Sequence, residues 1–201
     1  MSLGSLAARY VSGGDPGAVF DNGGSVCYGV YRFAAGVGMV QEFVRWLKGA
    51  GYVYAAELTE AVAGSDAFSA AWRRVAAADP AGFLAAQQRY GELVFYQLAK
   101  RRLEDNWFYA DKHSEAIGQV IFSAAVEYSS FYLPELFFTA CNNMGFPNLS
   151  YIDAAKFDAE LIGAVYEVRA SDEWTAHCPE FRSLLRKRYK AECGEALAML
   201  G

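Results

Sequence analysis

Few side chains in this 201-residue chain have the types and spacing that metal or nucleophilic chemistry needs. The histidines are His113 and His177, and neither stands in an HxxxH or similar spacing, so we interpret both as surface or helix-end residues. The four cysteines contain no CxxC pair and are expected to be reduced. The sequence therefore predicts no metal site, no cofactor and no histidine-based triad.

The composition is that of a globular protein. Hydrophobic residues make up 54% and charged residues 20%, and the net charge is −5. An acidic chain without a basic run is a poor nucleic-acid binder, so that class is set aside. No run approaches the ~18 apolar residues of a membrane span, and no signal peptide is visible. We expect synthesis in the cytoplasm, no membrane insertion, and delivery to the cell wall by a particle or a holin-like route.

Most of the chain shows the apolar spacing of amphipathic helices. The expected helices lie at 39–47, 80–103, 114–128, 133–145 and 158–170, and a last one opens at Cys178-Pro179. The segment 12–38 differs, because it is rich in glycine and contains Asp15-Pro16 and Asn22-Gly23. These are turn signals, and they predict a short strand or hairpin between helices.

The order of residues in this segment is more informative than its composition. It reads Ala8-Arg9-Tyr10-Val11-Ser12-Gly13-Gly14-Asp15-Pro16-Gly17-Ala18-Val19, then Asp21-Asn22-Gly23-Gly24, then Tyr28-Gly29-Val30-Tyr31-Arg32-Phe33. The order resembles the N-terminal signature of lysozyme-like, chitosanase-related peptidoglycan hydrolases of phages and secretion systems. Stretches at 83–90, 121–128 and 161–169 are similar to later helices of that family, in the same order.

The resemblance implies a mainly α, lysozyme-like fold in a single domain over 1–201. A small β-hairpin or loop region would lie at about 12–38, beside a cleft. It also implies action on the glycan strand of peptidoglycan or a related aminosugar polymer. Such enzymes use a glutamic acid as general acid and a second carboxylate that stays charged, and their aromatic side chains stack on sugar rings.

Several positions depart from the family pattern. Val11 stands where the family has its catalytic glutamate, Arg32 and Glu127 stand where it has glutamines, and Cys27 replaces a serine. Losing a general acid alone typically costs ~10²–10⁴-fold in rate. The departures therefore indicate a site with degraded or altered catalytic machinery.

The resemblance still places candidate site residues. Asp21 and Glu127 are the candidate catalytic carboxylates, and the expected substrate-binding residues are Tyr10, Val11, Gly24, Tyr28, Tyr31 and Arg32. Because Arg32 and Glu127 replace two neutral amides with opposite charges, we expect them to form an ion pair. The alternatives are that Asp21 caps a loop, that Glu127 pairs with a local lysine or a backbone group, and that Arg32 points to solvent.

Three functions remain open on the sequence. In the first, the chain is a lysozyme-like protein that acts on or binds glycan with altered catalytic machinery. In the second, it is an active glycoside hydrolase that uses Asp21 and Glu127. In the third, it is an unrelated helical structural or interaction protein. The expected partners are peptidoglycan or another aminosugar polymer and proteins of a phage or secretion particle.

Overall fold

The computed structural model describes residues 2–21, 24–176 and 178–201. It divides into two compact units. We call Ala7–Leu93 the hairpin unit, and we call the residues up to Leu6 together with Val94–Gly201 the helical unit. The expectation of one domain over 1–201 stays a prediction.

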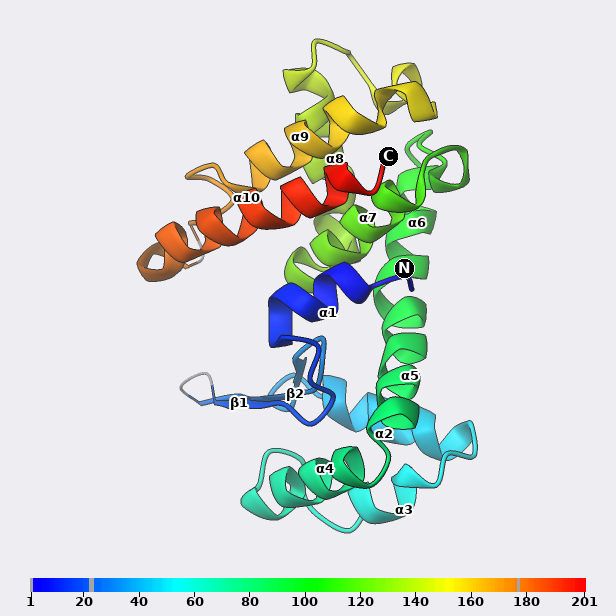
Figure 1. The fold of residues 1–201 in the computed structure, drawn as a ribbon, viewed down its shortest axis with the longest axis vertical. Coiled ribbons are helices and arrows are strands. Elements are labelled where there is room, and N and C mark those ends of the chain that lie inside the picture. The colour runs from blue at the N-terminus through cyan, green and yellow to red at the C-terminus, as the bar shows by residue number, and fades with distance from the viewer. Residues whose placement is uncertain (1, 22–23, 177) are drawn as a thin grey trace. The chain divides into compact units, whose positions relative to one another are not determined.

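The hairpin unit holds the strands of the described residues, in one antiparallel sheet with the order β1-β2-β3. Figure 1 labels β1 and β2. β1 (Val19–Asp21) pairs with β2 (Val26–Tyr28), and β2 pairs with β3 (Phe33–Ala34). All three lie inside the segment 12–38, so the expected location of the β region is confirmed.

In the described part of the chain, one helix precedes the three strands, and four follow them before a π-helical turn. The bounds are α1 (Ser5–Ser12), α2 (Met39–Gly49), α3 (Tyr54–Leu58), α4 (Asp66–Ala78) and α5 (Pro80–Gly91). Ser65 caps α4 by accepting a hydrogen bond from the Phe68 N–H, and Asp79 caps α5 by accepting one from the Gly82 N–H. The apolar face of α2 is buried at Val40, Phe43, Val44 and Leu47, and this packing holds the helix in place.

An aromatic core ties the sheet to the helices of the hairpin unit. The Trp72 ring of α4 lies 5.3 Å from Tyr28 of β2, 5.7 Å from Phe43 of α2 and 4.8 Å from Phe83 of α5, measured between ring centroids. Such contacts add to the free energy of burial. The hairpin is therefore packed against a rigid aromatic cluster.

Gln87 of α5 binds the backbone before β1 and the backbone between β2 and β3. Its Oε1 accepts a hydrogen bond from the Val30 N–H at 2.9 Å, and its Nε2 donates to the Pro16 carbonyl at 2.9 Å. Gly29 adopts φ +72° beside it, and a Cβ there would lie 2.1 Å from the Gln87 Oε1. Glycine is required at that position by both the backbone angle and the close approach.

The helical unit is built around α7. Its helices are α6 (Gln97–Glu104), α7 (Glu115–Tyr128), α8 (Leu133–Asn143), α9 (Asp158–Arg169) and α10 (Arg182–Ala198). Every residue of α7 from Ala116 to Ala125 is buried, because α6, α8, α9 and α10 all pack on it. In Figure 1, α9 and α10 run alongside each other.

One predicted helix is interrupted. The segment expected to be a continuous helix over 80–103 contains a π-helical turn, Glu92–Tyr96, between α5 and α6. Gly91 stands directly before this turn, and its weak helix propensity favours local unwinding.

His113 occupies a helix end, as expected, but it is not a surface residue. Its imidazole is fully buried between the carboxylates of Asp158, whose Oδ1 lies 2.6 Å from Nδ1, and Asp153, whose Oδ1 lies 3.5 Å from Nε2. These contacts join the residues before α7 to Asp153 and to the first residue of α9. His177, the other histidine predicted to be a surface or helix-end residue, lies outside the described residues.

Candidate functional site

The end of α1 holds the position for which the resemblance predicts a catalytic glutamate. Val11 stands there with only 8% of its surface exposed. Arg32, at φ 54°, donates from Nε to the Val11 carbonyl at 3.1 Å, and its guanidinium lies 4.3 Å from the centroid of the Phe20 ring. An apolar side chain and a guanidinium held by the backbone thus occupy this corner of the hairpin unit, and neither supplies a proton to a glycosidic oxygen.

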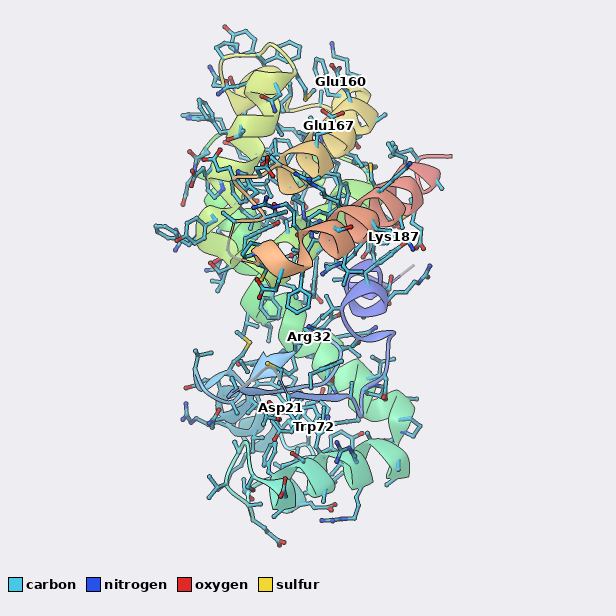
Figure 2. All side chains as sticks on the ribbon, turned by 90° about the vertical axis from the view of Figure 1, so that its left-hand side faces the viewer. Asp21, Arg32, Trp72, Glu160, Glu167 and Lys187 are labelled. Carbon is cyan, nitrogen blue, oxygen red and sulfur yellow. The ribbon has the colours of Figure 1, made fainter. Side chains whose placement is uncertain are left out.

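Asp21 ends β1, opposite Val26, and its side chain is exposed. Figure 2 shows Asp21 and Arg32 on the hairpin of the same unit. Gly24 is exposed at φ +125°, and Tyr10 is half-buried on α1. The roles predicted for these residues in catalysis or substrate binding stay predictions.

Tyr28 and Tyr31 do not fit the substrate-binding role expected of them. They are 0% and 2% exposed, and Tyr28 donates or accepts a hydrogen bond at 2.9 Å with the Ser69 hydroxyl inside the core. Burial also raises the pKa of the Tyr31 hydroxyl. Both rings belong to the packing of the hairpin unit and offer no face to a sugar.

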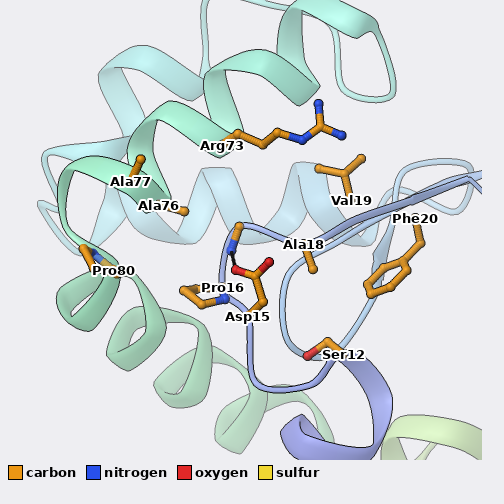
Figure 3. Close-up of a pocket in the computed structure, with 11 residues that line it drawn as sticks. Ser12, Asp15, Pro16, Ala18, Val19, Phe20, Arg73, Ala76, Ala77 and Pro80 are labelled. Carbon is orange, nitrogen blue, oxygen red and sulfur yellow. Dashed lines mark hydrogen bonds between the residues drawn. The ribbon is translucent and has the colours of Figure 1, made fainter.

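A groove of about 570 Å³ lies beside the hairpin, between the turn after α1 and the C-terminal part of α4 (Figure 3). Its floor is made of small residues such as Ala76 and Ala77, and its charged groups are Asp15 and Arg73. The Asp15 carboxylate accepts a hydrogen bond from the Gly17 N–H at 2.8 Å. Asp15 is therefore a turn-stabilising residue, as the Asp-Pro-Gly sequence indicates.

Glu127, the second candidate catalytic carboxylate, lies in the helical unit near the end of α7. Its Oε2 accepts a hydrogen bond from Arg169 at 2.8 Å, and its Oε1 accepts one from the Tyr189 hydroxyl at 2.5 Å. Arg188 lies 3.5 Å from Oε2. Both carboxylate oxygens are thus engaged by groups from α9 and α10.

This environment keeps Glu127 ionised. Burial alone would raise its pKa, but the charges of Arg169 and Arg188 and the Tyr189 hydrogen bond outweigh that effect, so the pKa is lowered from its ordinary value of 4.5. A general acid needs a proton near neutral pH. Glu127 is therefore suited to a charged role and not to proton donation.

Arg169 is the cation at the centre of this network. Its side chain is fully buried, its Nη1 lies 3.6 Å from Glu192, and its guanidinium lies 4.5 Å from the centroid of the Tyr189 ring. Glu192 also accepts a hydrogen bond from Ser123. In the helical unit, arginines and not a lysine balance Glu127. The expected pair with Arg32 involves residues of different units and stays a prediction.

Glu127 also borders an open pocket of about 470 Å³ in the helical unit, which we call the aromatic–acidic pocket. Its lining combines three glutamates with three aromatic rings: Glu127, Glu135, Glu173, Tyr128, Tyr132 and Trp174. Trp174 and Tyr128 meet edge to face, with centroids 5.0 Å apart. Aromatic faces and carboxylates together are suited to binding a polyhydroxylated ring.

Most of this pocket was not predicted from the sequence. Glu135, Glu173 and Trp174 lie outside the stretches that resemble the family, and only the neighbouring Glu127 was singled out. The weak signal was the aromatic pair Phe131-Tyr132 placed directly before the Leu133-Pro134 helix start.

Within residues 2–21, 24–176 and 178–201, no group of three or more histidine, cysteine, aspartate or glutamate side chains is placed to hold a metal ion. None of the helices there combines the length and apolar character needed to cross a bilayer.

Comparison with known proteins supports the fold. A solved structure described as a chitosanase complex is similar, with a TM-score of 0.62 and 17% sequence identity over 94% of this chain and 87% of that chain. The mainly α, lysozyme-like fold is thereby confirmed. A comparison with curated proteins finds no match. Residues 3–193 match the family described as type VI secretion system spike protein VgrG3-like, C-terminal, and the chain therefore belongs to that family.

Proposed function

We propose that this chain is a lysozyme-like domain, delivered with a secretion spike, that binds the glycan strand of peptidoglycan and has lost or altered the parent hydrolytic chemistry. The VgrG3-like family supports an association with the secretion particle. The chitosanase-like fold supports an aminosugar polymer as the ligand. Membership of the family excludes the alternative of an unrelated helical protein.

The observation that carries the altered chemistry is the state of Glu127. The carboxylate is held by Arg169 and Tyr189 with a lowered pKa, so it has no proton to give. The predicted alignment of Val11 with the family's glutamate supports the same conclusion, because a buried valine cannot donate a proton. Asp21 is the other candidate catalytic carboxylate, and glycoside hydrolysis needs a protonated acid beside a charged carboxylate.

Purified peptidoglycan sacculi test the proposal in two assays. We expect the wild-type chain to sediment with sacculi and to release reducing sugar at less than about 1% of the rate of an active lysozyme, because a missing general acid costs ~10²–10⁴-fold. Asp21→Asn serves as the matched variant and should leave sedimentation intact. Failure to sediment with sacculi would contradict the binding proposal.

An active hydrolase is the second candidate, and the aromatic–acidic pocket favours it because three glutamates gather beside aromatic rings. Rapid release of reducing sugar by the wild-type chain would support this candidate over the first. Glu135→Gln and Glu173→Gln would then identify the proton donor, with loss of the rate and unchanged sedimentation.

A further inference from the structure

Trp107 occupies an unusual position at the end of α6. The Trp107 N–H donates to the Glu104 carbonyl and the Phe108 N–H donates to the Leu103 carbonyl, both at 3.0 Å. These bonds form a Schellman motif in which Trp107 takes the left-handed position, with φ 66°. That position usually holds glycine, since a side chain there is strained.

The strain is not offset by burial of the Trp107 side chain, which is 67% exposed. The hydrophobic contact that accompanies this motif comes from its neighbours, because Leu103 and Phe108 are fully buried. A bulky residue that neither caps the helix better than glycine nor fills the core indicates a function for the exposed ring.

Trp107 lines a second groove of the helical unit, with a volume of about 470 Å³. Phe138 of α8, which is 45% exposed, and Pro134 give it further apolar surface. Glu135 lines both this groove and the aromatic–acidic pocket, so the two cavities are neighbours on either side of one side chain.

Asp105 and Glu135 are the charged residues that line the groove, and its uncharged polar groups are two asparagines, each with one end of its side-chain amide available. Asn106 donates from Nδ2 to the Arg102 carbonyl at 2.8 Å, and Asn148 accepts at Oδ1 from the Ser150 N–H at 3.1 Å. Among the described residues, no hydrogen bond engages Oδ1 of Asn106 or Nδ2 of Asn148. The two amides thus offer one acceptor and one donor beside an exposed indole and the carboxylates of Asp105 and Glu135.

We propose that this Trp107 groove is a sugar-binding subsite that holds the glycan strand outside the aromatic–acidic pocket. The C–H face of a pyranose ring matches the indole of Trp107, and hydroxyl or acetamido groups match the free ends of the two asparagine amides. Because Glu135 lines both cavities, one extended polymer could occupy the groove and the pocket together. The inference rests on the proposed function, because it assumes that the ligand is a glycan.

Trp107→Gly is the decisive variant, since it removes the ring and relieves the left-handed strain. The probe is a β-1,4-linked N-acetylglucosamine hexasaccharide, with binding followed by calorimetry on the full chain. We expect the affinity to fall at least about tenfold, while the melting temperature stays the same or rises. A structural role for the indole would lower the melting temperature instead. Trp107→Asn, which also tolerates the left-handed region, repeats the test if the glycine variant folds poorly.

Leu184→Ala is the matched control, because Leu184 is an exposed apolar residue of α10 in the same unit, with 65% of its surface accessible. It should bind the hexasaccharide like the wild type. If the wild type binds and Trp107→Gly binds equally well, the subsite is wrong, the proposed function stands, and the exposed ring is better explained as a protein contact. If the wild type binds neither the hexasaccharide nor sacculi, the subsite and the proposed function both fail.

Discussion

At the scale of single residues, the environment of a carboxylate decides what it can do more than its presence does. Glu127 is close to an open pocket, yet Arg169 and Tyr189 hold both of its oxygens. A carboxylate tied in this way stabilises the fold through its charge. Replacing Glu127 is therefore expected to lower the stability of the fold, whatever its effect on catalysis.

Replacing Glu127 by glutamine should destabilise the chain by about 3 kcal/mol, because the change weakens a buried ion pair and leaves Arg169 under-compensated. Chemical denaturation measures the difference. Glu135→Gln is the control, because Glu135 borders the same pocket but is exposed, and its change should stay within about 0.5 kcal/mol. Equal stability of the two variants would show that the Arg169 network contributes nothing.

Restoring the acid at position 11 should not restore hydrolysis. In Val11→Glu, the guanidinium of Arg32, whose Nε already contacts the Val11 carbonyl, would hold the pKa of the new carboxyl down. Release of reducing sugar from sacculi should stay near the wild-type level. The double change with Arg32→Gln removes that charge and should release more sugar than Val11→Glu alone. High activity in Val11→Glu alone would contradict this account.

The sequence could predict Val11 and Arg32 as departures from the family pattern because both lie inside a contiguous motif. It could not show that Tyr28 and Tyr31 are core residues, since a resemblance gives a position in the chain and not a degree of burial. The pairing of Glu127 with Arg169 joins residues 42 positions apart and depends on how α7 and α9 pack, which no local pattern reports.

At the scale of elements, the hairpin depends on helices that follow it in the chain. Residues of α4 and α5 bind its backbone, with Trp72 Nε1 donating to the Pro16 carbonyl at 2.8 Å and Gln87 bridging Pro16 and Val30. The glycine-rich pattern could predict where the hairpin lies, because turns are local. The bridging role of Gln87 could not be predicted, since a glutamine in a helix is ordinarily solvated.

Gln87→Leu should cost ~1–3 kcal/mol, because the buried Val30 N–H loses its acceptor while the leucine fills a similar volume. Thermal unfolding gives the stability, and amide exchange at Val30 should quicken. Gln88→Leu, one residue further along α5 and half-buried, should change neither quantity much. Unchanged exchange at Val30 in Gln87→Leu would rule out the bridge.

At the scale of the whole molecule, the motif order predicted the fold well because family stretches were spread from residue 8 to residue 169. The interruption of the helix expected over 80–103 was missed, because a π-helical turn keeps nearly helical side-chain periodicity. The Trp107 groove was missed for a different reason: Trp107, Phe138 and Asn148 come from separate segments, and no single segment shows a recognisable motif.

Acid should destabilise the whole chain through carboxylates of the helical unit. Burial raises the pKa of Asp153, but the Lys112 and Tyr109 hydrogen bonds and nearby charges outweigh it, so its pKa lies below the ordinary 3.8, as that of Glu127 lies below 4.5. A carboxyl whose pKa is lowered by folding stabilises the protein above its unfolded pKa, and this contribution is lost as the pH falls through the folded pKa. Melting temperature should therefore change little from about pH 7 to pH 5 and fall below about pH 4.5.

One variant shows how much Glu127 contributes to the loss of unfolding free energy in acid. Each carboxyl of this kind contributes up to about 1.4 kcal/mol of stability per pH unit in the range between its two pKa values. Glu127→Gln starts from a lower stability but no longer takes up that proton, so its unfolding free energy should fall less steeply between about pH 4.5 and pH 3 than that of the wild type. Glu135→Gln, which removes an exposed carboxyl, should keep the wild-type slope. Denaturant titrations at several pH values measure both curves, and parallel curves for wild type and Glu127→Gln would mean that Glu127 is not held ionised by Arg169.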